Sequence, residues 1–269
     1  MVETIGFPEL LRRSRKDRRW SQEQLAHEAE TSARHLSCLE TGKSNPSRAM
    51  VLKLARALDL DLRERNLMLQ SAGFNTMYRN RDLDSPEMAP VMHAIELIME
   101  QQEPYAAFLL DRVWNVLRVN RGGSILIGAL VDGDTPPELM GNLMKASLHP
   151  DGFKSCIQQW PEYAALAIAR LEREVALHPR DRARHELLSA VRGYPGISQA
   201  AVHSPAHADP MAIIHLERGD LSLRLFGMVT TVGTPFDITA QEVMLESFFP
   251  ADDETKAWFL AQQKAIVDA

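Results

Sequence analysis

The sequence has few cysteines and no long apolar run. Its two cysteines, Cys38 and Cys156, are too few for a disulfide framework or a CxxC metal motif, which indicates a reducing compartment. The longest apolar stretches are far shorter than the ~20 residues that a membrane-spanning helix needs. The N-terminal stretch has no apolar core followed by a cleavage site, so we expect no signal peptide. These absences favour a cytoplasmic protein with no part in a membrane.

Motifs of common enzymes and metal sites are also missing. The GGS at 122–124 is neither a phosphate-binding loop nor a nucleophile elbow, and the HPDG at 149–152 is typical of a turn. His203 and His207 are four residues apart, but no cysteine or carboxylate accompanies them at a recurring metal spacing. We therefore expect no enzymatic activity, no metal site and no resident cofactor.

The composition is that of a globular chain with room for two domains. It has 269 residues, of which 45% are hydrophobic and 25% charged. The net charge of −6 is unevenly distributed: residues 1–74 carry 13 Lys and Arg against 10 Asp and Glu, whereas the rest carries 17 against 26. A mildly basic N-terminal part suits contact with DNA through one end only, because the phosphate field acts over short distances.

Residues 1–74 are predicted to form an all-α bundle of about five short helices. Ser21 is followed three residues later by Gln24, which is the spacing of a capping box. The later helices have their own start signals, namely Thr31 or Ser32, then Pro46 and Ser47, then Asp61. Gly42 and Gly73 are placed to end helices. The next residues lose the apolar periodicity and contain prolines, so we interpret 75–92 as a linker.

Residues 93–269 are predicted to form a second domain of the α+β class. Two β-like runs, 105–110 and 113–119, are separated by an Asp-Arg turn, and two more at 211–216 and 221–232 surround a turn with Gly219. The region between these pairs reads as mostly helical, and a helix is expected from about 252 to 267. Strands that flank a helical insert favour an antiparallel sheet.

Residues 20–58 contain SQEQLA, LSCLETGKSNPS and LKLARAL, and they resemble the Cro/cI-like helix-turn-helix family, also called the xenobiotic-response-element family. The resemblance implies double-stranded DNA as the partner, with the helix from Ser32 to Thr41 in the major groove. Residues on the outward side of this region are the candidate DNA contacts: Gln22, Ser32, Ala33, Arg34, Ser37, Cys38, Lys43, Asn45 and Ser47, with Arg48 beside them. Among these, Arg34 is the side chain able to contact guanine through two hydrogen bonds.

The same resemblance matches Arg15 and Glu40 to an internal ion pair that ties the first helix to the third. Two departures from the family pattern stand out. Glu30 lies in a turn where a small residue, often glycine, is usual, and Ala33 and Cys38 hold positions that are often long and polar. The alternative is that the charged side chains form a solvated face on a bundle that binds protein.

The remainder resembles the MmyB-like regulators, whose C-terminal ligand-binding domain has a PAS-like fold. The segments that carry the resemblance are 103–120, 147–153 and 229–252. It implies a sheet that holds a small apolar molecule, such as a fatty acid, against helices. Apolar side chains of the expected strands are the candidate pocket residues: Tyr105, Phe108, Leu110, Trp114, Phe226 and Met228. Ordinary core packing is the alternative for each of them, because pocket walls and cores use the same residues.

The chain is therefore expected to be a cytoplasmic DNA-binding transcription regulator that works as a homodimer and senses a small molecule. A ligand would shift the population between two dimer arrangements that differ in half-site spacing. Two alternatives stay open for the C-terminal domain. It either dimerises or binds a partner protein without any ligand, or it carries haem or flavin as a PAS-like sensor.

Overall fold

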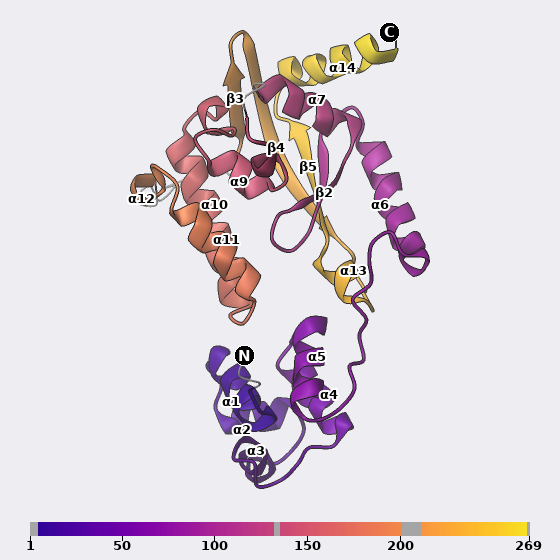
Figure 1. Ribbon diagram of the computed structural model, residues 1–269, viewed down its shortest axis with the longest axis vertical. Helices are drawn as coiled ribbons and strands as arrows, with labels where there is room; N and C mark the ends of the chain where they lie inside the picture. Colours follow the sequence, from indigo (N-terminus) through magenta and orange to yellow (C-terminus); the bar gives the residue numbers. More distant parts are fainter. Residues whose placement is uncertain (1–4, 132–134, 201–210, 268–269) are drawn as a thin grey trace. The chain divides into compact units, whose positions relative to one another are not determined.

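The computed structural model describes residues 5–131, 135–200 and 211–267 (Figure 1). The chain divides into two units. Unit 1 runs from Met1 to Met88 and includes Thr234–Gln241, whereas unit 2 consists of Ala89–Gly233 and Glu242–Ala269. His203 and His207, which the sequence offered as a histidine pair, lie outside the described residues. Within the described part of the chain, every helix is too short or too polar to cross a membrane.

Unit 1 contains the five N-terminal helices that the sequence predicts: α1 (Phe7–Asp17), α2 (Gln22–Glu28), α3 (Ala33–Glu40), α4 (Arg48–Ala57) and α5 (Leu62–Ser71). Their N-caps follow the predicted start signals. Ser21 and Gln24 form a complete capping box at α2, and Ser32 and Ser47 cap α3 and α4. Each cap oxygen accepts one of the backbone N–H groups that a helix start leaves without a partner, which fixes where the helix begins.

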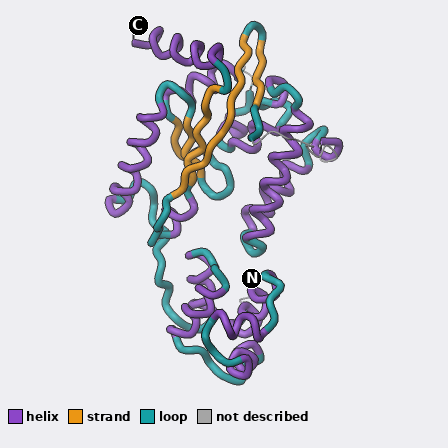
Figure 2. Tube along the Cα trace, turned by 180° about the vertical axis from the view of Figure 1, so that it is seen from behind, coloured by secondary structure: helices purple, strands orange, loops and turns teal. Residues whose placement is uncertain are grey.

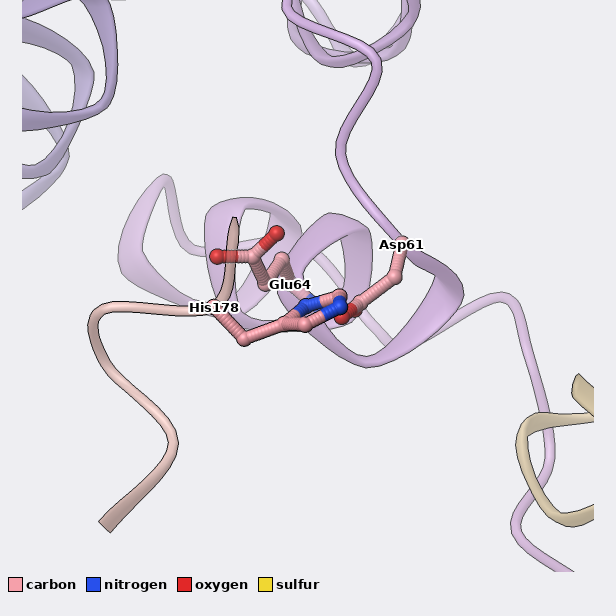
Figure 3. A group of neighbouring side chains, drawn as sticks. All are labelled: Asp61, Glu64 and His178. Atoms are coloured by element: carbon pink, nitrogen blue, oxygen red, sulfur yellow. The ribbon is translucent and has the colours of Figure 1, made fainter. Parts of the chain in front are cut away.

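Asp61 caps α5, and its Oδ1 accepts a hydrogen bond from the Glu64 backbone N–H at 2.7 Å (Figure 3). His178, also drawn in Figure 3, belongs to unit 2, where its backbone N–H donates to the Glu174 carbonyl and ends helix α10 (Trp160–Leu177). Helices as short as these five are marginal alone, so their stability comes from a shared core. That core contains fully buried leucines from α2, α3 and α4: Leu25, Leu36, Leu39 and Leu54.

Residues 75–88, which form most of the predicted linker 75–92, are held in unit 1 by hydrogen bonds. The buried Asn66 of α5 accepts from the backbone N–H groups of Met77 and Tyr78 and donates to the Tyr78 carbonyl at 2.6 Å. A short 3-10 helix, η1 (Pro86–Met88), ends this stretch. The predicted boundary at residue 74 therefore differs from the division in the structure, because a polar, aperiodic segment can still be ordered by one buried amide side chain.

Thr234–Gln241 also belongs to unit 1, although the chain reaches it from unit 2. The Ile238 N–H donates to the Arg79 carbonyl at 2.8 Å, and Arg81 pairs with the buried Asp237 at 2.7 Å. Helix α13 (Ile238–Glu242) begins here, and Gln241 accepts from the first N–H of α5, that of Leu62, at 2.7 Å. This segment thus completes the start of α5 as a side-chain cap does.

Unit 2 is built on a five-stranded, fully antiparallel sheet, which agrees with the α+β, PAS-like class that the sequence predicts. Its strands are β1 (Ala107–Leu110), β2 (Val116–Val119), β3 (Ile214–Arg218), β4 (Leu221–Thr231) and β5 (Met244–Pro250). Their order is β2-β1-β5-β4-β3, so the last strand in sequence lies at the centre. The sequence predicted four of these strands and missed β5.

Helices cover both faces of this sheet, as the views from front and back show (Figures 1 and 2). Helix α6 (Ala89–Gln102) lies on one face, where it lines a cavity together with Leu109 and Leu245. The other face carries the larger core with α7 (Arg121–Leu130), α9 (Leu143–Leu148) and α10. The remaining helical segments of the described chain are α8 (Pro137–Met140), η2 (Lys154–Cys156), α11 (Arg182–Arg192), α12 (Ile197–Ala200) and α14 (Asp253–Val267).

Candidate DNA-binding surface and ligand cavity

Helix α3 separates buried leucines from outward side chains, as the predicted recognition helix requires. Leu36 and Leu39 are fully buried, three residues apart on one face. Arg34 is exposed, whereas Ala33, Ser37 and Cys38 are partly exposed on the outer side. Arg34 is thus the long donor-bearing side chain that the outer face of α3 presents to solvent.

The candidate DNA contacts outside the outer face of α3 lie around the starts of α3 and α4. The Ser32 and Ser47 hydroxyl oxygens accept from the backbone N–H groups of His35 and Met50 at 3.1 and 3.2 Å, so both serines act as caps and keep a hydroxyl hydrogen that can be donated. Lys43, Asn45 and Arg48 are exposed in and after the turn that follows α3. Helix starts with exposed N–H groups and nearby cations suit phosphate oxygens.

Arg15 and Glu40 form an ion pair with two parallel hydrogen bonds, at 2.6 and 2.8 Å. The Glu40 side chain is 2% exposed, and Arg15 also donates to the Trp20 carbonyl at 2.6 Å. Burial alone would raise the pKa of Glu40, but the hydrogen bonds from Arg15 and Gln22 hold that pKa below its usual value. Gln22, one of the candidate DNA contacts, is partly buried and donates to Glu40 at 2.8 Å.

The turn between α2 and α3 has the backbone geometry that makes glycine usual there. Glu30 has a φ of +41°, in the left-handed region that side chains with a Cβ rarely adopt. Lys53 of α4 pairs with its carboxylate at 2.8 Å, and this pair holds the pKa of Glu30 below its ordinary value. The departure from the family pattern at Glu30 therefore leaves the turn in place and adds an exposed ion pair.

Unit 2 contains a cavity of about 250 Å³ between the sheet and helices α7, α9 and α10. Most of its wall is apolar. Phe108 of β1 and Phe248 of β5 line it from the sheet, and Leu126, Met144 and Ala167 line it from the helices. A largely apolar wall with a few convergent polar groups is the usual form of a small-molecule site.

The polar groups of this wall come from α10 and β5, with Ser147 of α9 nearby. Arg170 Nη1 lies 3.4 Å from Glu246 Oε1, and burial raises the pKa of Glu246 above its ordinary value although Arg170 opposes this. Tyr163 is hydrogen-bonded to Ser147, and burial raises the pKa of Tyr163 to about 12. The tyrosine is therefore a neutral hydrogen-bonding group across the physiological pH range.

Trp114, in the turn between β1 and β2, contacts Arg170 at the polar end of the cavity, the part of the wall where Arg170 and Glu246 lie. The Arg170 guanidinium lies over its ring at 4.1 Å, and its indole N–H donates to Glu174 at 3.1 Å. Trp114 has a φ of +68°, which is unusual for a bulky residue, and Asp111 holds this turn by accepting from the backbone N–H groups of Val113 and Asn115. The turn thus presents a flat aromatic surface to one cation.

The structure brings two of the six predicted pocket residues to this cavity, Phe108 and Trp114. The other four lie elsewhere. Tyr105 packs edge-on against Phe259, Leu110 is fully buried in the core, Phe226 stacks on Phe249, and Met228 is 58% exposed. Side chains alternate between the faces of a strand, so a strand that turns Leu225 and Gly227 toward the cavity turns Phe226 and Met228 away.

Sequence reasoning missed the polar residues of the cavity, Arg170, Glu246 and Tyr163, and the glycine that lines it, Gly227. A signal for Glu246 exists, since it is an isolated acid two residues before the Phe248-Phe249 pair, but nothing local shows that it is buried.

A second cavity of about 330 Å³ lies on the other face of the sheet, between α6 and strands β1, β4 and β5. Ile95, Ile98, Leu109 and Leu245 are among its lining residues. Threonines are the polar part of its wall among the described residues, and a ligand there would meet no charged partner. The first cavity is therefore the better candidate for a specific site.

The two parts of the chain match two known families. Residues 8–68 match the helix-turn-helix domain family, and residues 91–261 match the family described as MmyB-like transcription regulator ligand binding domain. Both are families of transcription regulators and not of enzymes. Among curated proteins, no match to the chain was found.

Proposed function

The chain belongs to the family of MmyB-like transcription regulators, and on this premise we propose that the cavity between β1, β4, β5 and α10 binds a small, mainly apolar molecule that controls DNA binding by unit 1. The regulator families supply DNA binding and a ligand-binding domain. The observation that carries the proposal is the cavity itself, which combines an apolar wall with the buried Glu246 and the partly exposed Arg170 that pairs with it. A fatty-acid-like chain suits the apolar wall. As a transcription regulator, the protein would act in the cytoplasm.

We propose that α3 enters the major groove with Arg34 toward the bases. Ser32, Ser37, Lys43, Asn45 and Ser47 would contact the phosphate backbone on either side of α3, because phosphate contacts fix the register of a helix on the duplex. Ala33 and Cys38 would contact bases through their small apolar surfaces. Gln22 would hold Glu40 and, through it, the angle between α1 and α3, which supports the DNA contacts indirectly.

The path from ligand to DNA is proposed to run through Thr234–Gln241. This segment follows β4 and precedes β5, and both strands line the cavity, through Gly227 and Glu246. In unit 1 it binds Arg79 and Arg81 and completes the start of α5. A ligand that moves β4 against β5 would therefore pull on a segment that belongs to the DNA-binding unit. A ligand must favour one of two states to shift their populations.

We propose that the protein works as a homodimer, since regulators with this motif read two half-sites. The exposed apolar side chains Leu97 and Ile98 of α6 and Met228 and Val229 of β4 lie in unit 2 and are the side chains we expect a second copy to cover. The same observation favours the alternative function, in which the C-terminal domain only dimerises or binds a partner protein.

One experiment separates these functions. Native mass spectrometry of the purified full chain reports its oligomeric state and any molecule that copurifies with it. Fluorescence anisotropy with labelled operator DNA, before and after the protein is stripped of that molecule, then reports whether the molecule changes DNA affinity. A dimer that carries a small molecule and changes its DNA affinity after stripping supports the sensor. A dimer that gains no mass from any apolar compound and binds DNA equally before and after stripping supports the dimerisation module.

A further inference from the structure

The polar end of the cavity presents a carboxylate whose hydrogen bonds are incomplete. Glu246 is 8% exposed. Its Oε1 has only a long contact with Arg170, at 3.4 Å, and its Oε2 is buried with no partner among the residues that the structure describes. A carboxylate can accept about four hydrogen bonds, and a buried one that lacks them is costly. The rotation of a glutamate carboxylate about its last bond is soft, so either oxygen can face an incoming group.

The cation beside this carboxylate is already shared. Arg170 lies between Glu246 and Glu174, at 3.4 and 3.5 Å, and its flat face covers the Trp114 ring. The local charge balance is therefore one cation against two carboxylates. A ligand carboxylate placed here would add a third anion to this group, whereas a ligand donor would meet a waiting acceptor.

Gly227 keeps the approach to Glu246 open. A Cβ at this position on β4 would lie 3.4 Å from Glu246 Oε1 and 3.5 Å from the nearest carbon of the Phe248 ring. Any larger side chain would crowd the space beside the carboxylate. Both distances are ordinary van der Waals contacts, so a single Cβ fits at this position, whereas a branched side chain would occupy the space beside the carboxylate.

We propose that the ligand of this cavity is an apolar molecule that ends in a hydrogen-bond donor, an amino group or a hydroxyl, which binds the Glu246 carboxylate. This inference rests on the proposed function of the cavity. It keeps the apolar chain of a fatty-acid-like ligand and replaces the carboxylate head group by a hydrogen-bond donor. The apolar wall accommodates the chain or ring, and the pairing of the donor with Glu246 selects the head. An amine binds more tightly than an alcohol, because a charge-assisted hydrogen bond is stronger than a neutral one and the site is short of cations.

Three probes of one chain length test the proposal: decylamine, decanol and decanoic acid. Each is titrated into the stripped full chain at neutral pH by isothermal titration calorimetry. We expect decylamine and decanol to bind roughly tenfold or more tighter than decanoic acid, since one hydrogen bond to a charged group has about this effect. Glu246→Gln should remove the preference for the amine and narrow the range of the three affinities. Glu254→Gln, at an exposed position on α14, is the matched control and should keep the wild-type ranking.

The outcomes are distinguishable. Decanoic acid as the tightest probe of the wild-type chain overturns the head-group inference and leaves the ligand-binding function in place. An unchanged ranking in Glu246→Gln, with circular dichroism showing a folded protein, overturns the role of Glu246. The order of the three probe affinities is measured on the wild-type chain. A Glu246→Gln variant that fails to fold therefore does not affect this test. Failure of all three probes to bind the wild-type chain overturns both the inference and the ligand cavity on which it rests.

Discussion

Removal of Glu40 should destabilise unit 1 more than the loss of any exposed ion pair. Glu40→Ala leaves the Arg15 guanidinium, whose side chain is 10% exposed, without its carboxylate, and it also removes the acceptor of the Gln22 amide. A buried charge that loses its partner costs about 3–5 kcal/mol. This is a large part of the roughly 5–15 kcal/mol by which a domain is stable. Glu9→Ala, which removes an exposed pair with Arg13 within α1, should cost about 0.5 kcal/mol or less.

Urea denaturation of the full chain measures this cost, and hydrogen exchange of peptides from α1 and α3 assigns the affected transition to unit 1. The double variant Arg15→Met with Glu40→Leu should recover much of the loss, because it removes both buried charges. The pKa of Glu40 is lowered in the folded protein, so its contribution is present above the unfolded pKa of about 4.3 and is lost as the pH falls through the folded value. Equal losses for Glu40→Ala and Glu9→Ala at neutral pH would refute the reasoning.

Four further outcomes are expected. Arg34→Ala should weaken specific DNA binding by about 1–3 kcal/mol and relax base preference at one position; binding-site selection that recovers the wild-type preference would contradict a base contact. Glu30→Gly should raise the melting temperature of unit 1, because glycine adopts the positive φ of this turn without strain; a lower melting temperature would mean that the exposed Lys53 pair outweighs the strain. Asp237→Ala should leave decanol affinity unchanged in calorimetry while it reduces the effect of decanol on DNA affinity; an undiminished effect would exclude this segment as the path. Gly227→Val should weaken decanol binding by about 1.4 kcal/mol or more, a tenfold loss, and full affinity would place the head group elsewhere.

Unit 1 was largely predictable because the signals that define it are local. The Ser21–Gln24 capping box and the Asp61 cap each act over three residues, and the spacing of Leu36 and Leu39 identifies the inner face of α3. The sequence did not show that the segment after α5 has a fixed conformation. This conformation depends on hydrogen bonds to Asn66 and on Thr234–Gln241, which reaches unit 1 from far along the chain. Contacts over such separations leave no periodic pattern.

The ligand cavity was predictable in class but not in its chemistry, and β5 shows why. This strand reads MLESFFP, and the Glu246-Ser247 step in its middle breaks the apolar run that identifies a central strand. Glu246 is tolerated there because Arg170, on a helix far away in sequence, lies beside it. Sequences are expected to break local rules where a function requires it. An apolar residue at 246 would pack against Phe108 and Phe248 without any desolvation cost. Binding of a ligand by Glu246 therefore explains this charged residue on the central strand better than the packing of the sheet does.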